Sequence, residues 1–377
     1  MRIAMIQDDW FPLVRGGSVH VRELSIALAE QFGHEIDIFT RALKQDGIRY
    51  TENRSYADGA VSVYRLKPCT EYWNPIGRLS SMLTPLLQLN RGKYDIIHGH
   101  TFLPSVPTWA GSYLSGSPNV LTIHGTAIPS GVGHDTSGFA RIRRWIERLL
   151  LLEIPYDHLI SVNRKHMDLL SGAHEKVSFV PNGVDLDRFE IERDTVSGRI
   201  LYVGRLAPKK RVEDLIEAYA MAREDVPESE LVIVGTGPMR GDLETLAARH
   251  GITEHVQFKG YVEDDAIPEY YASAELFVLP AIWEGHPLTL LEAWAAGTPV
   301  IATNVEGIAE FVNHEETGYL VPPKSPPELA DGLSYALNHP KVTSKWGIQG
   351  KEVATSEYSW AQSAQKTNSV YRQMSRS

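Results

Sequence analysis

Short apolar runs alternate with helical apolar patterns along most of the chain. The first run, Arg2 to Gln7, predicts a buried strand, and the apolar spacing from Val19 to Leu28 predicts a helix that ends near Gly33. Further strands are predicted at 35–40, 59–66, 95–100, 120–125, 159–162 and 177–180. Strands that alternate with helices are typical of a parallel sheet with crossover helices.

The pattern starts again after a polar segment, 187–198, which predicts a linker. The second series contains predicted strands at 199–204, 231–234, 256–258, 276–279, 299–302 and 318–321, and predicted helices at 213–221, 240–250, 267–272, 327–337, 342–356 and 359–374. The chain is therefore predicted to be an α/β protein with two Rossmann-like domains that face each other across a cleft. Ligands of open α/β sheets bind beyond the carboxyl ends of the strands.

Composition narrows the functional class. A chain of 377 residues has room for two α/β domains, and its net charge of −10 argues against a nucleic-acid-binding protein. The single cysteine, Cys69, excludes an internal disulfide and fits a reducing compartment. No run approaches the ~18 apolar residues of a membrane span. We therefore expect a cytoplasmic protein.

Two glutamates, Glu284 and Glu292, flank a turn and a predicted helix start. Pro287 suits the first helical position. The N–H groups near Leu288 and Thr289 would then point beyond the preceding strand, where a helix N-terminus favours a phosphate. The carboxylates would accept hydrogen bonds from sugar hydroxyls on either side of it. The alternative is a solvated loop glutamate and a helix-surface glutamate.

A basic loop, from Gly204 to Lys210, follows the first strand of the second series. Arg205 and Lys210 could reach one diphosphate, the arginine by bidentate bonds and the lysine as a point charge. A solvated basic loop is the alternative.

Three further turns follow strands in this half. Gly235 and Gly237 imitate a dinucleotide fingerprint, but the spacing to Gly241 is one residue too long, so a tight strand-to-helix turn is the better interpretation. Tyr261 with Val262 could line a base pocket or simply pack at a strand end. The turn at 305–310 should neighbour the stretch that holds both glutamates.

In the first half, Gly16-Gly17 precedes a helix and would let backbone approach a ligand closely. His100 and His124 each end a predicted strand of the same sheet. A histidine there could bind a sugar hydroxyl or phosphate, or act as acid or base. A lone histidine is more often structural, but two at neighbouring strand ends favour a role in the cleft.

Several motifs occur in a fixed order along nearly the whole chain. They are Gly16-Gly17, Thr122-Ile123-His124-Gly125, Pro181-Asn182-Gly183-Val184-Asp185, Gly204-Arg205 with Lys210, Gly235-Thr236-Gly237-Pro238, and Glu284 with Glu292 followed by Gly297-Thr298-Pro299-Val300. Together they resemble the retaining glycosyltransferases of family 4, which have the two-Rossmann GT-B fold. The resemblance implies an N-terminal acceptor domain at 1–190, joined by a returning C-terminal helix at 358–377, and a nucleotide-sugar donor domain at 191–357.

The resemblance also implies roles. Arg205 and Lys210 would stabilise the leaving diphosphate, Glu284 would contact the donor sugar, and Glu292 would bind the ribose hydroxyls. The remaining implied contacts are the Leu288 and Thr289 N–H groups and Gly17 with phosphate, His124 with the transferring sugar, and Ser161 and Asn163 along the cleft. Gly16, Gly204, Tyr261, Val262 and His286 complete the set assigned to donor binding.

Two positions depart from the family pattern. Arg211 stands where the family usually has glycine, and His286-Pro287 replaces the commoner Phe-Gly. The second change leaves the donor sugar open, because these residues would lie close to it.

Mechanism follows from the charge that develops on the diphosphate, which cations and helix N–H groups can stabilise without a metal. We therefore expect no metal and no cofactor besides a UDP-, GDP- or ADP-sugar donor. Asp185-Leu186-Asp187 mimics a DxD metal motif, but its place after Asn182-Gly183 predicts a turn and a helix cap. No carboxylate nucleophile is evident, which favours a front-face route.

The stretch 141–152 predicts a basic amphipathic helix. Its apolar face holds Ile142, Trp145, Leu149 and Leu152, and another face holds Arg141, Arg144 and Arg148. Such a helix can lie on an anionic membrane or meet a lipid phosphate, which would suit a lipid-linked acceptor. The alternative is a helix packed on the sheet with a solvated basic face.

Three rival functions stay open. A GT-B-like sugar-nucleotide epimerase or hydrolase would act without any acceptor, and an NAD-dependent oxidoreductase would rest on Gly235 and Gly237. A non-catalytic sugar-nucleotide sensor is disfavoured by the combined set of Arg205, Lys210, Glu284 and Glu292.

Overall fold

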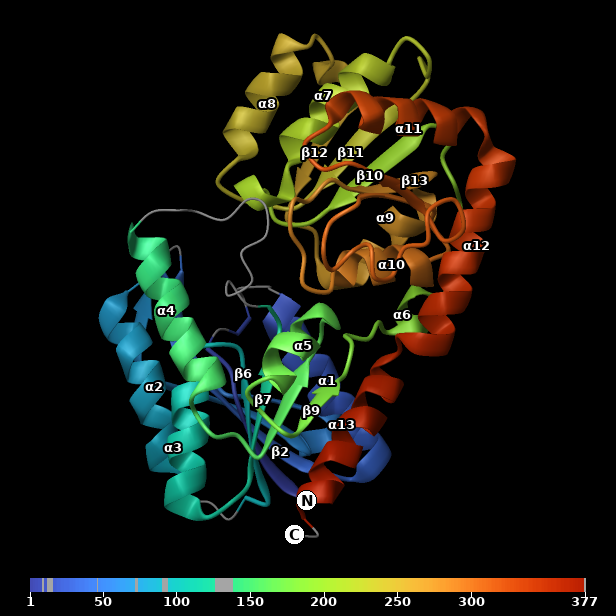
Figure 1. Ribbon diagram of the computed structural model, residues 1–377. Helices are drawn as coiled ribbons and strands as arrows, with labels where there is room; N and C mark the ends of the chain where they lie inside the picture. The colour runs from blue at the N-terminus through green and yellow to red at the C-terminus, as the bar shows by residue number, and fades with distance from the viewer. Residues whose placement is uncertain are drawn as a thin grey trace. The chain divides into compact units, whose positions relative to one another are not determined.

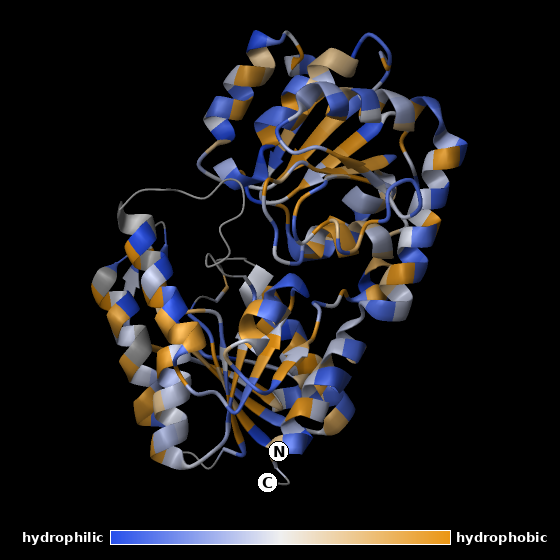
Figure 2. Cartoon of the chain, in the orientation of Figure 1, coloured by the Kyte–Doolittle hydropathy of each residue, from blue (hydrophilic) through white to orange (hydrophobic). Residues whose placement is uncertain are grey.

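The computed structural model describes residues 1–8, 10–11, 16–45, 47–71, 74–89, 94–125 and 138–375. The chain forms two compact units, and each has its own sheet flanked by helices (Figure 1). Unit 1 comprises Met1–Gly183 and Trp360–Ser377, and unit 2 comprises Val184–Ser359. Figure 2 shows that apolar residues concentrate on the strands of both sheets, as the sequence pattern predicts.

Unit 1 contains a mostly parallel sheet in the order β4-β5-β2-β1-β6-β7-β8-β9, with β3 paired to β2. Its strands are β1 (Arg2–Ile6), β2 (Glu35–Gln45), β3 (Ile48–Tyr50), β4 (Arg54–Tyr56), β5 (Val61–Glu71), β6 (Ile96–His100), β7 (Asn119–Ile123), β8 (His158–Ser161) and β9 (Val177–Phe179). Only β3 and β4, two short strands that the sequence pattern misses, pair antiparallel among the described strands.

The helices of unit 1 are α1 (Gly16–Phe32), α2 (Pro75–Leu89), α3 (Ser105–Ser115), α4 (Gly138–Leu152), α5 (Lys165–Ser171) and α13 (Trp360–Met374), with a 3₁₀ turn at Ala57–Gly59. The C-terminal helix α13 returns to unit 1, as expected. The Tyr371 hydroxyl lies 2.6 Å from His98 Nδ1 and Asn368 Oδ1 lies 2.9 Å from His34 Nε2, so hydrogen bonds fix α13 to the sheet and to the start of β2.

Unit 2 contains a fully parallel sheet in the order β12-β11-β10-β13-β14-β15. Its strands are β10 (Arg199–Val203), β11 (Glu230–Val234), β12 (Val256–Gly260), β13 (Leu276–Leu279), β14 (Val300–Thr303) and β15 (Tyr319–Val321). Its helices are α6 (Leu186–Phe189), α7 (Val212–Ala222), α8 (Arg240–Arg249), α9 (Ile267–Ser273), α10 (Leu288–Ala295), α11 (Pro326–Asn338) and α12 (Pro340–Glu357), with 3₁₀ turns at Pro208–Lys210, Thr253–His255 and Asp264–Ala266. Each long element lies within a few residues of its predicted position.

The predicted linker at 187–198 is wrong. Arg193 donates hydrogen bonds to the carbonyls of Gly297 and Ala274, and the Glu275 carboxylate accepts one from the Gly198 N–H at 2.6 Å. The polar groups of this segment therefore form hydrogen bonds with the rest of unit 2 and are not simply solvated. Val184 and Phe189 are buried in the unit 2 core, so this unit begins seven residues before the expected boundary.

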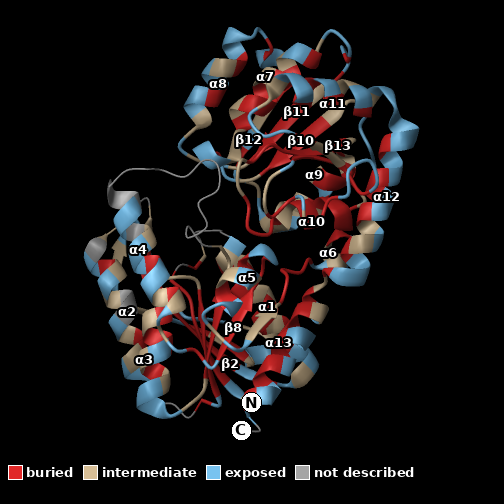
Figure 3. Cartoon of the chain, viewed as in Figure 1, coloured by how far each residue is buried: buried red, intermediate tan, exposed pale blue. Residues whose placement is uncertain are grey.

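Most of the apolar face that the sequence defines on α4 is exposed. Ile142, Trp145 and Leu149 are 59%, 64% and 41% exposed, whereas Glu147 and Leu151 are buried (Figure 3). Leu152, the fourth residue of that face, packs against a core cluster that contains Leu151, and Arg141 and Arg148 are exposed. The solvated basic face of the alternative interpretation is therefore present, but most of the apolar face is not buried. No helix among the described residues is both long and apolar enough to cross a membrane.

The glycine turn after β11 serves packing, as the tight-turn interpretation predicts. A Cβ on Gly237 would lie 2.1 Å from the Leu206 carbonyl oxygen, and one on Gly235 would lie 1.9 Å from that of Gly204. The Leu206 N–H donates to the Thr236 carbonyl at 2.9 Å. The turn therefore supports the loop that follows β10, which carries Arg205 and Lys210.

This contact predicts opposite effects for two glycine substitutions. Gly237→Ala should lower the free energy of unfolding by about 2 kcal/mol or more, because the new methyl group meets backbone that cannot move cheaply. Gly241→Ala, in the first turn of α8 with open space around it, should instead raise it by about 0.5–1 kcal/mol. Urea denaturation of both variants measures the difference, and equal stability would contradict the packing role.

Candidate functional site

The strand order of unit 2 reverses direction at one point. The chain moves outward from β10 through β11 to β12, and then returns to the other side of β10 with β13, β14 and β15. A crevice opens at such a switch point, beyond the carboxyl ends of the two strands. Arg205 and Lys210 follow β10, and Glu284 with the start of α10 follows β13, so the sequence-predicted residues meet here.

Lys210 and Glu284 form an ion pair at this edge, with side chains only 17% and 10% exposed. The pairing is supported by the backbone, because the Ile282 N–H donates to the Lys209 carbonyl at 3.0 Å. The partial burial of both groups means that their charges are screened less than on an open surface. A ligand that meets one of these side chains must therefore also meet the other.

Arg205 is exposed, and its loop is held by the Tyr202 hydroxyl, which donates to the Arg205 carbonyl at 3.1 Å. Burial, with a smaller contribution from the Glu284 carboxylate, raises the pKa of Tyr202 well above its usual range. Tyr202 thus stays protonated and keeps its donor. No motif indicates this tyrosine, because it lies inside the β10 strand pattern.

The turn at 305–310 neighbours the Glu284 loop, as predicted. Gly307 has a φ of +82°, and a Cβ there would lie 2.1 Å from the Glu284 carbonyl oxygen. The backbone of the turn therefore packs directly against the backbone of Glu284 and fixes the position of that residue.

Helix α10 begins one residue later than expected, with Pro287 as its N-cap rather than its first residue. The first N–H groups of a helix have no partner inside it, so those of Leu288 and Thr289 are available to an anion at this edge. The helix ends at Ala295, and Gly297 follows it with a φ of +69°, which is typical of a glycine after a helix end.

Glu292 is held one turn into α10 by Tyr271, whose hydroxyl donates to the carboxylate at 2.8 Å. Burial raises the pKa of Glu292, while the hydrogen bond from Tyr271 and the nearby Arg188 cation oppose that rise. Glu292 is therefore not the free helix-surface glutamate of the alternative interpretation. Tyr271 and Arg188 act on the Glu292 carboxylate, and no sequence motif indicates them.

Three other residues assigned to donor binding differ in their surroundings. The His286 ring is buried, with its centroid 4.3 Å from that of Phe311 and 5.6 Å from that of Tyr358. Tyr261 is 58% exposed beyond β12, so the interpretation of it as a strand-end packing residue is wrong. Val262 packs against the apolar core around α10. Contact of His286, Tyr261 or Val262 with a donor stays a prediction.

Asp185 serves as the predicted helix cap. Its carboxylate accepts a hydrogen bond from the Arg188 N–H at 3.2 Å, at the start of α6.

In unit 1 the strand order reverses between β1 and β6, and the predicted residues lie at that edge of the sheet. Gly16 and Gly17 open α1 after β1, and a Cβ on Gly17 would approach the Gln7 side-chain amide to 3.1 Å. His100 is the last residue of β6, and His124 directly follows β7. The rings of His100 and His124 stack with centroids 5.7 Å apart.

The structure adds His20, on α1, to these two histidines. Its ring centroid lies 4.4 Å from that of His124, and its Nδ1 lies 2.8 Å from Asn182 Oδ1. Burial lowers the pKa of His20 to about 4 and that of His100 well below its usual value, so both rings are neutral at pH 7. Helical spacing alone makes His20 resemble a core residue, which is why the sequence did not reveal it.

Ser161 and Asn163 are buried in their own turn. The Ser161 hydroxyl donates to the Asn163 carbonyl at 2.7 Å, and the Asn163 side chain accepts from the Lys165 N–H at 2.8 Å. Their hydrogen bonds therefore shape the loop after β8.

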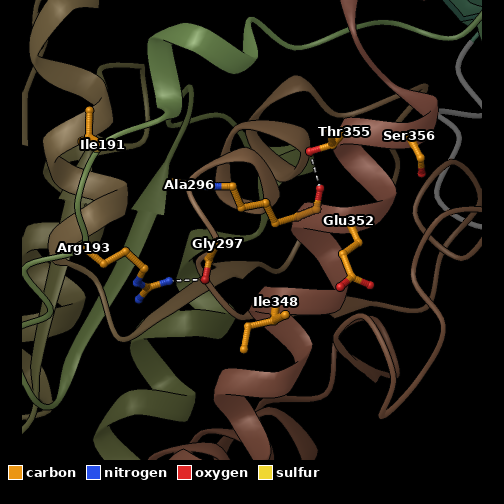
Figure 4. Close-up of a pocket in the computed structure, with 9 residues that line it drawn as sticks. Ile191, Arg193, Ala296, Gly297, Ile348, Glu352, Thr355 and Ser356 are labelled. Carbon is orange, nitrogen blue, oxygen red and sulfur yellow. Dashed lines mark hydrogen bonds between the residues drawn. The ribbon is translucent and has the colours of Figure 1, made fainter.

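A pocket lies elsewhere in unit 2, at the carboxyl end of α10 (Figure 4). Its lining residues are Ile191, Arg193, Ala296, Gly297, Ile348, Lys351, Glu352, Thr355 and Ser356. Arg193 spans it to the Gly297 carbonyl. None of these is a predicted site residue. The pocket lies at the opposite end of α10 from the N-terminus, whose N–H groups favour an anion.

Comparison with known proteins agrees with this geometry. The sequence model "Glycosyltransferase Family 4" matches residues 14–188, and "Glycosyl transferases group 1" matches residues 184–353. An uncharacterised glycosyltransferase of Methanocaldococcus jannaschii is 29% identical over 99% of this chain and 98% of its own length. A glycogen synthase of Mycobacterium tuberculosis is 28% identical over 98% of this chain and 94% of its own.

A solved structure gives the same result at the level of the fold. The sucrose-phosphate synthase of Thermosynechococcus elongatus superposes with a TM-score of 0.85 and 25% identity, covering 99% of this chain and 98% of its own. The two family models together match nearly the whole chain, and each unit has a parallel or mostly parallel sheet. The chain therefore belongs to the family 4 glycosyltransferases, which have the GT-B fold.

Proposed function

We propose that this glycosyltransferase moves a sugar from a UDP-, GDP- or ADP-sugar to a hydroxyl acceptor, with retention of anomeric configuration and without a metal. The observation that carries the proposal is the Lys210–Glu284 ion pair beside the α10 N-terminus, at the strand-order reversal of unit 2. The pair supports the proposal because its cation could bind a phosphate and its carboxylate could accept a hydrogen bond from a sugar hydroxyl.

The protein would bind the donor at both of its ends, the sugar and the ribose. Glu284 accepts from a hydroxyl of the sugar, and Glu292, one turn into α10, accepts from the ribose hydroxyls. Between them the N–H groups of Leu288 and Thr289 meet the phosphates. Tyr271 supports this arrangement because its hydrogen bond holds the Glu292 carboxylate in one orientation.

Breaking the sugar–phosphate bond leaves negative charge on the diphosphate and oxocarbenium character on the sugar. Lys210 and Arg205 would stabilise the departing diphosphate, and their fixed positions avoid reorganisation during the reaction. His124, which directly follows β7, would accept or donate a hydrogen bond at the transferring sugar. With no carboxylate assigned as nucleophile, the acceptor hydroxyl would attack from the face that the diphosphate leaves.

The competing oxidoreductase interpretation loses its basis in the glycine turn. Gly235 and Gly237 contact the backbone of Gly204 and Leu206, so their lack of a side chain is already explained by packing. A sugar-nucleotide epimerase or hydrolase would use the same donor site, and product analysis without acceptor separates it from a transferase.

Lys210→Ala should lower kcat by about 10²–10³-fold, the effect expected when one preorganised donor to a developing charge is lost. Glu284→Gln should raise the donor KM and lower kcat together, because it keeps the shape but removes both the sugar acceptor and the partner of Lys210. Lys345→Ala, an exposed lysine on α12, is the matched control. Steady-state transfer kinetics, with melting temperatures to confirm folding, test the assignment. Near-normal turnover of Lys210→Ala would contradict it.

Donor binding should weaken at acidic pH, because a protonated Glu292 can no longer accept from both ribose hydroxyls. Burial raises the pKa of Glu292, so the loss begins above the usual range of a glutamate. The hydrogen bond from Tyr271 favours the ionised carboxylate, so Tyr271→Phe should raise that pKa further and move the rise in donor KM to higher pH. Tyr335→Phe, on α11, is the control. Superimposable KM–pH profiles for wild type and Tyr271→Phe would show that Glu292 does not hold the ribose.

We also propose that α4 brings the enzyme to a membrane that holds its acceptor. The exposed Ile142, Trp145 and Leu149 lie on the same helix as Arg141 and Arg148, which are exposed as well. An apolar stripe beside arginines suits the boundary of an anionic bilayer. The basic helix contrasts with the net charge of −10 of the whole chain.

The double variant Ile142→Ser with Trp145→Ser should reduce the fraction of protein that floats with anionic vesicles several-fold. Ile348→Ser removes an equally exposed isoleucine from α12 and should leave flotation unchanged. Flotation with anionic and zwitterionic vesicles, at low and high salt, measures the effect. Absence of wild-type binding to anionic vesicles would refute the membrane role without touching the transfer chemistry.

A further inference from the structure

Three histidines converge at the carboxyl edge of the unit 1 sheet, from three different elements. They are His20 on α1, His100 at the end of β6 and His124 after β7. One ring nitrogen of each lies within 4.8 Å of the corresponding nitrogens of the other two. Within the described parts of the chain, no other set of three metal-ligating side chains comes this close together.

In the part of the chain that the structure describes, the His100 ring is buried without hydrogen bonds that would offset the loss of its contacts with water. Its side chain is 0% exposed, and neither ring nitrogen has a hydrogen-bond partner among the described residues. Its neighbour His98 is equally buried, yet the Tyr371 hydroxyl lies 2.6 Å from its Nδ1 and the Thr122 hydroxyl 2.7 Å from its Nε2. Burying a polar group without a partner costs about 1–3 kcal/mol. The contrast indicates that His100 is placed for a ligand.

His20 is oriented for the same ligand. Asn182 Oδ1 can only accept, so the His20 Nδ1 that lies 2.8 Å away carries the proton and Nε2 keeps its lone pair. That Nε2 is buried and has no hydrogen-bond partner among the described residues. A second hydrogen bond of this kind, which fixes the tautomer and the ring orientation, typically accompanies a metal-binding histidine.

We infer that His20, His100 and His124 form a site for one divalent transition-metal ion of the zinc type. Imidazole nitrogens suit zinc, cobalt, nickel and copper, whereas magnesium and calcium prefer oxygen ligands. Three protein ligands leave a fourth position for water or an oxygen ligand. Tetrahedral zinc with ordinary Zn–N bonds sets its nitrogens about 3.3 Å apart, so nitrogens that lie within 4.8 Å of one another need to close by at most about 1.5 Å.

The cations assigned to the diphosphate are Arg205 and Lys210 of unit 2, and none of the three histidines belongs to that set. The transfer reaction therefore does not depend on this ion. Because a bound ion would occupy the His124 nitrogen, zinc should inhibit transfer. That consequence alone rests on the proposed function of His124.

Cobalt binding tests the site directly. The full chain, with no histidine tag and stripped with a chelator, should bind one equivalent of Co²⁺ and develop the intense visible bands of a four-coordinate ion, which Zn²⁺ then displaces. His100→Ala and His20→Ala should each lose these bands. His174→Ala, which removes a unit 1 histidine bonded to the Leu151 carbonyl, should keep them. Melting temperatures without metal show whether each variant folds.

Asn182→Ala gives a second test that leaves all three imidazoles in place. Loss of the hydrogen bond that orients His20 should weaken cobalt binding by about 10–100-fold. Absence of bound cobalt in the wild type, or a cobalt spectrum that persists in His20→Ala and His100→Ala, would overturn the inference.

Inhibition separates the metal site from the proposed function. Transfer by the wild type should fall as zinc fills the site. If cobalt and zinc bind as described and transfer continues at its normal rate, the metal site stands and the assignment of His124 to the sugar is wrong.

Discussion

Parallel pairing is the constraint on which both halves of this protein depend. Every strand of the unit 2 sheet runs in one direction, so every strand ends at the same edge, and the loops that follow are gathered there whatever their distance in sequence. Lys210 and Glu284 are separated by more than seventy residues, yet their strands β10 and β13 are neighbours, and the two side chains form an ion pair. The reversal of strand order keeps crossover connections from covering that edge. The strand order therefore brings the charged side chains of these loops to one edge of the sheet.

The strand order alone does not fix the positions of the loops that carry these side chains. Contacts between backbone segments fix them. The loop of Arg205 rests on the glycine turn after β11, and the loop of Glu284 rests on Gly307. In both places a glycine lets one backbone touch another at a distance that any Cβ would prevent. The glycines that imitate a nucleotide-binding fingerprint are therefore structural supports for the residues proposed to bind the nucleotide.

The sequence predicts the architecture well because strands and helices alternate with strong apolar periodicity. Strand-end residues such as Arg205, Glu284 and His124 are predictable for the same reason, since a strand boundary places them at the edge of a sheet. Tyr271, Arg188 and His20 are not predictable, because their importance arises from partners distant in sequence: Glu292 for the first two, and Asn182 for the third. The segment 187–198 fails for a related reason. Its polar residues bond to backbone carbonyls that only the folded unit 2 brings near.

The two units handle polar groups at their strand ends in different ways. Unit 2 pairs groups of opposite charge, and the ion pair of Lys210 with Glu284 compensates their partial burial. Unit 1 uses histidines, which avoid the cost of a buried charge by giving up their proton. Neutral imidazoles cannot hold a phosphate by charge, but they retain lone pairs for hydroxyl groups and for metal ions. The way in which each unit compensates the burial of its polar side chains therefore decides which ligands it can bind. Unit 2 offers paired charges, and unit 1 offers the lone pairs of neutral rings.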